Sequence, residues 1–161
     1  MWSSDRRGVL AGLGALALAG CGFTPAYAPG GAGRSLRGRV RPATPANDAE
    51  FAFVRAFEDR LGRASAPEFE LRHRITTSER GAARVRALGA TRVSLFGTLV
   101  YELVDLASGE VVTEGSLRNF TNYSTTDAQL ATRRAAEDAQ ARLMTILADQ
   151  VAARLIAALG E

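Results

Sequence analysis

The chain of 161 residues contains no lysine, one cysteine and one histidine. Its 20 basic residues are all arginines, and 17 acidic residues nearly balance them, so the formal net charge is +3. A single cysteine cannot form a disulfide within the chain. Metal sites need clusters of histidine, cysteine or carboxylate groups, whereas the acidic residues here are scattered beside arginines, as in solvated ion pairs. The composition therefore indicates neither a disulfide scaffold nor a metal centre.

The first twenty residues have the pattern of a secretory signal peptide. Arg6 and Arg7 precede an apolar run at 9–20, which is too short for a membrane-spanning helix of about 20 apolar residues. The run ends in the tetrapeptide LAGC, which matches the bacterial lipobox. In a lipobox the cysteine sulfur receives a diacylglycerol, the signal is cut before it, and the new amino group is acylated.

We therefore expect residues 1–20 to be removed and Cys21 to be the lipidated first residue of the mature protein. One acyl chain binds membranes only marginally, whereas a tri-acylated cysteine anchors a protein stably. Gly22, in place of an aspartate, is compatible with sorting to the outer membrane. The arginine pair leaves Sec and twin-arginine export both open, and a free cysteine in an N-terminal helix remains the alternative. Export separates the protein from nucleic acid and makes an acidic glycolipid the better anionic partner.

Residues 21–34 are rich in glycine, proline and alanine and predict a flexible tether, followed by a single domain at 35–161. Alternating apolar residues predict strands, and apolar residues every three or four positions predict helices. Asn47 and Thr126 each precede a glutamate or glutamine by three residues, the spacing of a capping box. The expected elements are, in order, a strand at 35–41, a helix at 48–62, a strand at 68–76, a strand at 91–105, a strand at 111–123 with a bulge at Gly115, and a helix at 129–159.

This order of elements predicts an α+β fold with two layers. Each expected helix has one apolar stripe and the sheet has one apolar face, so the two helices should pack on one face of a four-stranded mixed sheet. The other face stays partly open. Phe96, Val100 and Val104 lie there, where a strand exposed to water would carry polar side chains. Contiguous exposed apolar residues usually mark contacts, so we expect these three residues to contact a partner protein.

The sequence gives little support to an enzyme. His73 is flanked by Leu71 and Ile75 on the inward side of its strand, and a general base needs an acid or a nucleophile within reach. Acylation of Cys21 would leave no thiol for a cysteine–histidine pair. The glycine-rich stretch GGAG lies in the expected tether and not between a strand and a helix, so it does not predict a phosphate-binding loop. We expect a structural histidine, no cofactor and no catalytic activity.

Three stretches together resemble the LPS-assembly lipoprotein family, LptE, in its alphaproteobacterial form. They are LAGCGFTPAY, the hairpin VYELVDLASGEVVTEGSLRNFTNYS and the final DAQLATRRAAEDAQARLMTILADQVAARL. The resemblance covers most of the mature chain and implies the same two-layer fold. It also implies an outer-membrane lipoprotein at the periplasmic face that plugs the large β-barrel translocon subunit LptD, assists its assembly and binds lipopolysaccharide on its way to the cell surface.

The resemblance further implies lipopolysaccharide contacts by basic residues between the second and third strands and near the start of the last helix. The residues in those regions are Arg86, Arg92, Arg133 and Arg134. The alternative is that these arginines are solvated surface charges, and Glu137 stands at ion-pair spacing from Arg133. Two other classes of function stay open: a lipoprotein that binds an envelope protein without a lipid role, and an envelope hydrolase that uses His73.

Overall fold

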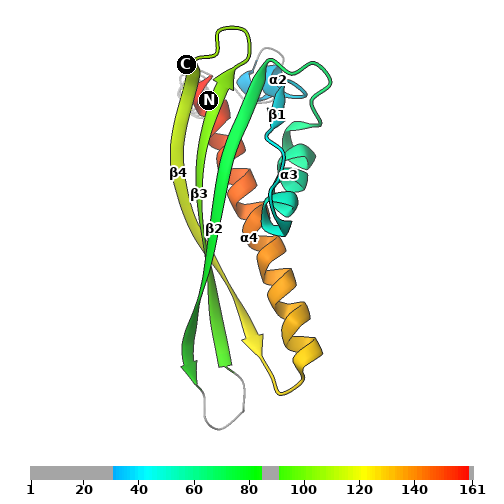
Figure 1. Ribbon diagram of the computed structural model, residues 1–161, viewed down its shortest axis with the longest axis vertical. Coiled ribbons are helices and arrows are strands. Elements are labelled where there is room, and N and C mark those ends of the chain that lie inside the picture. The colour runs from blue at the N-terminus through cyan, green and yellow to red at the C-terminus, as the bar shows by residue number, and fades with distance from the viewer. Residues whose placement is uncertain (1–30, 85–90, 160–161) are drawn as a thin grey trace, which may run out of the picture.

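The computed structural model describes residues 31–84 and 91–159, which form one sheet and three helices. The elements are, in order, α2 (Ala32–Leu36), β1 (Val40–Pro42), α3 (Asp48–Leu61), β2 (Phe69–Arg84), β3 (Thr91–Asp105), β4 (Val111–Thr125) and α4 (Gln129–Ala158). The sheet order is β1-β2-β3-β4, with β1 parallel to β2 and the other neighbours antiparallel. Helices α3 and α4 lie on the same side of the sheet (Figure 1) and share one buried core with it. The predicted α+β fold with a four-stranded mixed sheet is confirmed, and α2 is an additional short helix.

The segment predicted as a strand at 35–41 instead contains the end of α2 and the start of β1. Helix α2 begins within the predicted tether. Gly38 turns the backbone after α2 at a φ of +74°, and its N–H donates to a carbonyl at the end of α3 at 2.8 Å. Glycine adopts this left-handed conformation without a steric cost. Leu36 and Val40 are both buried, as the alternation indicated. They reach the core from a helix and from a short strand because Gly38 interrupts the extended path between them.

Helix α3 begins and ends where its sequence predicts. The Asn47 side chain accepts a hydrogen bond from the Glu50 N–H at 3.0 Å, and Gly62 ends the helix at a φ of +79°. The Glu50 carboxylate is itself buried. It accepts from the Ala46 N–H at 2.8 Å and from the Ile75 N–H of β2 at 3.4 Å. This side chain therefore ties the start of α3 to the middle of β2.

The three long strands match α4 in length. They contain 15 or 16 residues each, which is about 50 Å at about 3.3 Å per residue. Helix α4 has 30 residues, which is about 45 Å at about 1.5 Å per residue. β3 has its predicted bounds, but β2 continues past residue 76 and β4 past residue 123. Exposed polar residues occupy both faces of the β2 extension, so hydrophobic alternation could not reveal it.

The pairing of β3 with β4 contains a bulge near the turn, and not at Gly115 as predicted. The pairs on either side of it are Leu103 with Thr113 and Val104 with Val111. Val112 is therefore the extra residue. Gly115 pairs in regular register with Tyr101, whose ring occupies the space of a side chain, since a Cβ at Gly115 would lie 2.9 Å from the Tyr101 Oη.

Helix α4 starts without the predicted capping box at Thr126. Its N-cap is Ala128, which makes no side-chain hydrogen bond. The Thr132 hydroxyl instead accepts from the Thr126 N–H at 3.0 Å and donates to its carbonyl at 3.1 Å. The apolar stripe of α4 packs on α3, β3 and β4. Its buried residues are Ala139, Leu143, Met144, Leu147, Ala148, Val151, Ala152 and Leu155.

The two ends of the sheet differ in the helices that lie beside them. We term the end with β1 and the β3–β4 turn the proximal half. The distal half consists of residues 76–84 of β2, 91–98 of β3 and 118–125 of β4. Helix α3 lies beside the proximal half only, and the start of α4 lies at the distal end (Figure 1). Among the described helices, only α4 lies beside the distal half of the sheet.

Candidate functional site: the open face of the sheet

The open face of the sheet is the face opposite α3 and α4. It carries the even-numbered residues of β2 and β3, because odd-numbered residues such as Leu71 and Leu99 are buried in the core. Beyond the bulge it also carries the even-numbered residues of β4, since Phe120 pairs with Phe96. No helix among the described residues covers this face. Its side chains are therefore available to a ligand or a partner.

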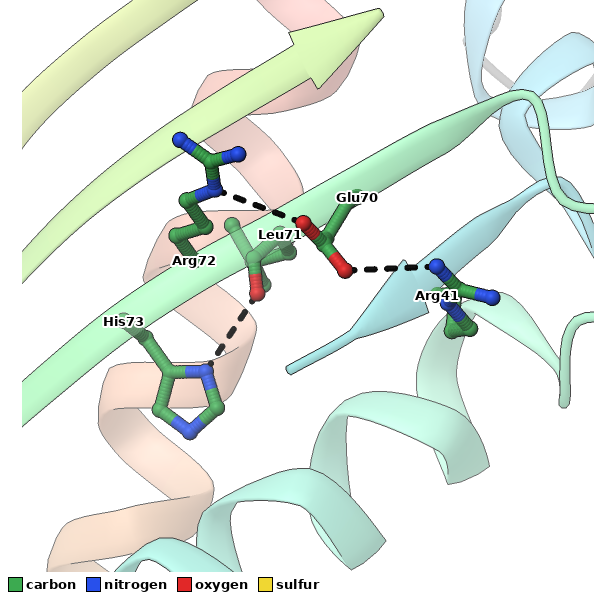
Figure 2. Close-up of polar contacts among 5 residues, drawn as sticks. All are labelled: Arg41, Glu70, Leu71, Arg72 and His73. Atoms are coloured by element: carbon green, nitrogen blue, oxygen red, sulfur yellow. Dashed lines mark hydrogen bonds and ion pairs between the residues drawn. The ribbon is translucent and has the colours of Figure 1, made fainter. Parts of the chain in front are cut away.

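Carboxylates balance the arginines in the proximal half of the open face. Glu70 accepts from Arg41 of β1 and from Arg72 of its own strand, both at 3.3 Å (Figure 2). Glu102 and Glu114 are cross-strand partners on the same face. These three carboxylates equal in number the three arginines on this half of the face, so its net charge is small, although Arg74 itself forms no ion pair with a described residue.

Three arginines and a pair of phenylalanines share the distal half of the open face. We term Arg80, Arg92, Phe96, Arg118 and Phe120 the arginine–phenylalanine cluster. The Phe96 and Phe120 ring centroids are 5.6 Å apart, and the Arg80 guanidinium carbon lies 5.4 Å from the Phe96 centroid. Arg118 Nε donates to a neighbouring threonine hydroxyl at 3.4 Å. Phe120 is 53% exposed, so the cluster presents aromatic surface beside guanidinium groups.

The electrostatics of the cluster favour an anionic ligand. The distal open face carries no carboxylate on the strand residues described by the structure. Within that same part of the chain, Arg80, Arg92 and Arg118 form no ion pair. Guanidinium groups can bind one phosphate through two parallel hydrogen bonds. The cluster is therefore a candidate site for an amphiphile that joins phosphate to hydrocarbon.

The three apolar residues predicted on this face have different environments. Val100 is 50% exposed, and Phe96 is partly buried within the cluster, so both lie on the open face. Val104 is only 4% exposed, and its prediction as a surface residue is wrong. It lies between its cross-strand neighbours Glu70 and Val111, beside the bulge and outside the main core. At this low exposure it offers almost no surface to a partner.

Three of the four arginines predicted to contact lipid are described by the structure. Arg92 is exposed and belongs to the cluster, and Arg133 and Arg134 are exposed near the start of α4. The starts of β3 and α4 lie at the same end of the molecule (Figure 1). No ion pair within the described chain holds either helical arginine. Arg86, like the predicted lipidation site Cys21, lies outside the described residues.

His73 lies on the inner face and packs against α3. Its ring centroid is 5.0 Å from that of Phe53, and its Nδ1 lies 3.4 Å from the Leu71 carbonyl oxygen (Figure 2). Burial lowers the pKa of His73 below its usual 6.5, and the hydrogen bond to Leu71 and the charge of Glu50 oppose this effect only in part. The described residues contain no group of three histidine, cysteine or acidic side chains that could hold a metal. A neutral imidazole packed on a phenylalanine is typical of a structural histidine.

An open hollow of about 310 Å³ adjoins this histidine between β2 and β3. Its lining residues are Arg72, His73, Arg74, Val100, Tyr101 and Glu102. The lining contains no serine, threonine, cysteine or lysine, so it offers no aliphatic hydroxyl, thiol or amine nucleophile beside the imidazole. It therefore does not compete with the cluster as the candidate site.

Three residues of the cluster were missed by the sequence analysis: Arg80, Arg118 and Phe120. Arg80 stands in the polar extension of β2, where alternation is lost. The faces of Arg118 and Phe120 depend on the bulge at Val112, since a shift of one residue moves every side chain to the other face. Leu117 is the residue of β4 that could have revealed these faces. It is a large apolar side chain that is buried in the core, so its neighbours at even-numbered positions lie on the open face.

The sequence of the chain matches that of a known family over most of its length. The match is to LptE, described as lipopolysaccharide-assembly, and spans residues 38–155. The chain belongs to the LptE family. The matched segment includes all four strands, α3 and most of α4, so the whole arginine–phenylalanine cluster lies within the LptE region. No protein in a search of curated sequences matches the chain.

Solved structures share the fold of this LptE-family chain. A proposed lipoprotein from Caulobacter crescentus has a TM-score of 0.67 at 21% identity, covering 79% of this chain and 95% of its own. A minor lipoprotein from Acinetobacter baumannii has a TM-score of 0.53 at 16% identity, covering 74% of this chain and 91% of its own. The rare lipoprotein B from Shewanella oneidensis has a TM-score of 0.51 at 12% identity, with 74% and 92% covered. At these identities the likeness supports the fold alone.

The helices of the described residues bear on whether the chain could span a membrane. None of those within residues 31–84 and 91–159 is both long and apolar enough to cross a bilayer.

Proposed function

We propose that this LptE-family protein binds lipopolysaccharide through the arginine–phenylalanine cluster, while a lipid on Cys21 holds it at the periplasmic face of the outer membrane. The observation that carries the proposal is that Arg80, Arg92 and Arg118, without carboxylate partners among the described residues, share one face of the sheet with the Phe96–Phe120 pair, of which Phe120 is exposed. Membership of a lipopolysaccharide-assembly family supports the choice of lipid. The protein acts by binding and catalyses no reaction.

The two chemistries of lipopolysaccharide match the two parts of the cluster. Its lipid A portion carries phosphates, which guanidinium groups bind by paired hydrogen bonds. Its acyl chains are apolar and suit the ring surfaces of Phe96 and Phe120. Arg133 and Arg134, near the start of α4, lie at the same end of the molecule but on the helix side of the sheet, and we propose that they add further basic groups for the lipid. The bound lipid would then lie along the distal half of the open face.

Removing the three cluster charges tests this proposal. Arg80, Arg92 and Arg118 are changed together to glutamine, and binding of purified lipopolysaccharide is titrated at low and high salt. Exposed ion pairs contribute about 0.5 kcal/mol each, so losing three should weaken binding about tenfold, and the difference should shrink at high salt. The matched control changes three arginines on the helices to glutamine: Arg34, Arg55 and Arg154, all exposed. This control should bind lipopolysaccharide nearly as tightly as the unchanged protein does.

The outcomes separate a specific site from a net-charge effect. Equal losses in the cluster variant and the helix control would show that only total charge matters. Unaltered binding of the cluster variant, with an unchanged melting temperature, would contradict the lipid role of the cluster. Changing Arg133 and Arg134 to glutamine in a separate variant measures what α4 adds.

We also propose that the open face contacts an LptD-like β-barrel, in which the protein sits as a plug and whose assembly it assists. The exposed Val100 and the phenylalanine pair, on a face that the described helices leave uncovered, support this surface as the contact. Changing Phe96 to aspartate should reduce recovery of the barrel with the lipoprotein from membranes and leave the chain folded. A folded variant that recovers the barrel in full would contradict the proposal.

Two other classes of function are separated by simple observations. A lipoprotein that binds some other envelope protein would not copurify with a large β-barrel. An envelope hydrolase would lose its function when His73 is changed to alanine, whereas a binding protein that remains folded would keep it.

A further inference from the structure

Beyond the short strand β1, one edge of strand β2 is unpaired with any described strand. β1 pairs with β2 only at residues 69–71 and lies at the proximal end of the sheet (Figure 1). β2 continues to Arg84, and no other described strand pairs on this side, because the sheet order is β1-β2-β3-β4. Its pairing with β3 on the other side stays regular until a shift after Ala82.

Hydrogen bonds at the proximal end show which backbone groups point outward. The Phe69 N–H donates to the Arg39 carbonyl at 3.1 Å, and the Leu71 carbonyl accepts from the Ala43 N–H at 2.9 Å. The Ile75 N–H donates to the Glu50 carboxylate at 3.4 Å. The odd-numbered residues of β2 therefore direct their N–H and C=O groups away from β3.

The outward backbone groups farther along the strand have no partner among the described residues. Thr77, Glu79 and Gly81 are exposed, and none of their outward groups bonds to another described residue. Neither proline nor lysine, two common devices for protecting an edge, occurs at these positions. Such an edge is a template onto which an extended peptide can add as a further strand.

We propose that this edge receives an extended segment of a second protein that carries acidic side chains opposite Arg74 and Arg80. Both arginines are exposed on the same face of β2, six residues apart, and neither forms an ion pair with a described residue. The positions between them on that face are Thr76 and Ser78, which are neutral. Opposite charges across neighbouring strands are stabilising, so the segment should carry two acidic residues six positions apart on one face.

The same charges make a second copy of this chain a poor occupant. Two copies paired antiparallel about Thr77 would place Arg74 of each copy opposite Arg80 of the other. Like charges directly opposite each other destabilise a strand pair. The inference does not depend on lipopolysaccharide binding, and its test contains no lipid.

The probe is a nine-residue peptide of alternating threonine and valine with glutamates at its second and eighth positions. The control peptide has lysines at the same positions. Amide hydrogen exchange is measured on the full chain with Cys21→Ser. The glutamate peptide should slow exchange at Thr77 and Glu79 by about tenfold at saturation, and the lysine peptide should leave it unchanged. Arg74→Glu combined with Arg80→Glu should reverse this preference, whereas Arg55→Glu combined with Arg154→Glu should preserve it.

A proline at Thr77 removes one outward N–H and tests the backbone contribution. Thr77→Pro should abolish binding of the glutamate peptide without disturbing the β2–β3 ladder, since proline is tolerated on edge strands. If this variant does not fold, the exchange pattern of the unchanged chain still decides. Absence of protection at Thr77 and Glu79, equal protection by both peptides, or a dimer that protects these amides by itself would each overturn the proposal.

Discussion

Replacing Gly97 by alanine tests how closely α4 packs on the sheet. A Cβ at Gly97 would lie 3.0 Å from Leu143 Cδ2, 3.2 Å from Leu147 Cδ1 and 3.3 Å from Leu143 Cγ. Both leucines are fully buried, so neither side chain can turn into solvent. Overpacking of this kind costs about 1–3 kcal/mol, and the reduced freedom of the unfolded chain offsets about 0.4–1 kcal/mol. We expect a net loss of about 1–2 kcal/mol in the free energy of unfolding.

The loss is measured by urea unfolding and by the melting temperature of the full chain with Cys21→Ser, so that no lipid is attached. A chain of this size should melt about 2–4 °C lower for each kcal/mol lost. Gly81→Ala is the matched control, because a Cβ there meets no atom within 4 Å. That variant should be as stable as the unchanged chain or slightly more stable.

A double variant shows whether the leucine contact causes the loss. In a Leu143→Ala background most of the crowding around residue 97 is removed, so Gly97→Ala should cost much less there, with a coupling energy of about 0.5–3 kcal/mol. An equal cost in both backgrounds would refute the packing argument, as would a Gly97→Ala chain as stable as the Gly81→Ala control.

Three further changes test other parts of the molecule. Glu50→Gln should lower the free energy of unfolding by about 1–3 kcal/mol, because the buried carboxylate accepts from the Ala46 and Ile75 N–H groups; urea unfolding checks this against Glu110→Gln, an exposed control, and equal effects would contradict it. Because burial lowers the pKa of His73 in the folded state, the unfolded chain binds a proton more readily, so His73 should destabilise the fold as the pH drops below about 6.5. The stability difference between the unchanged chain and His73→Gln should therefore vary with pH in that window, and a constant difference from pH 8 to pH 5 would argue against a buried neutral imidazole. Cys21→Ser should leave an uncleaved precursor without acyl label in cells, and normal maturation of this variant would refute lipidation at that residue.

The elements that follow from local chemistry were predictable from the sequence. Asn47 and Gly62 mark the ends of α3 because a side-chain cap and a left-handed glycine act over a few residues. The alternation of β3 gave both of its bounds, since one face is buried along the strand. Local sequence patterns gave a wrong prediction where the same residues could form two different hydrogen-bonded structures. Thr126 could cap α4, but the hydrogen bonds to Thr132 hold it in the preceding loop.

The candidate site was only half predictable because it depends on register. Alternation within β3 placed Phe96 and Val100 on the open face. The partners across the sheet are set by the extra residue Val112, which the sequence does not distinguish from a bulge at Gly115. The burial of Val104 likewise results from neighbours on other strands. Patterns within one strand give the face of a residue but not the residues beside it.

The division of the sheet into two halves explains how the proposed binding residues can occupy it at little cost in stability. In the proximal half α3 and α4 both pack against the strands, and β2 there buries Leu71 and Ile75. In the distal half β2 is exposed from residue 76 to residue 81, and α4 is the one described helix that accompanies the strands. Exposed positions tolerate substitution within about 0.5 kcal/mol. Arginine and phenylalanine side chains can therefore occupy the distal end with little effect on the free energy of unfolding, while the proximal core keeps the strands in register.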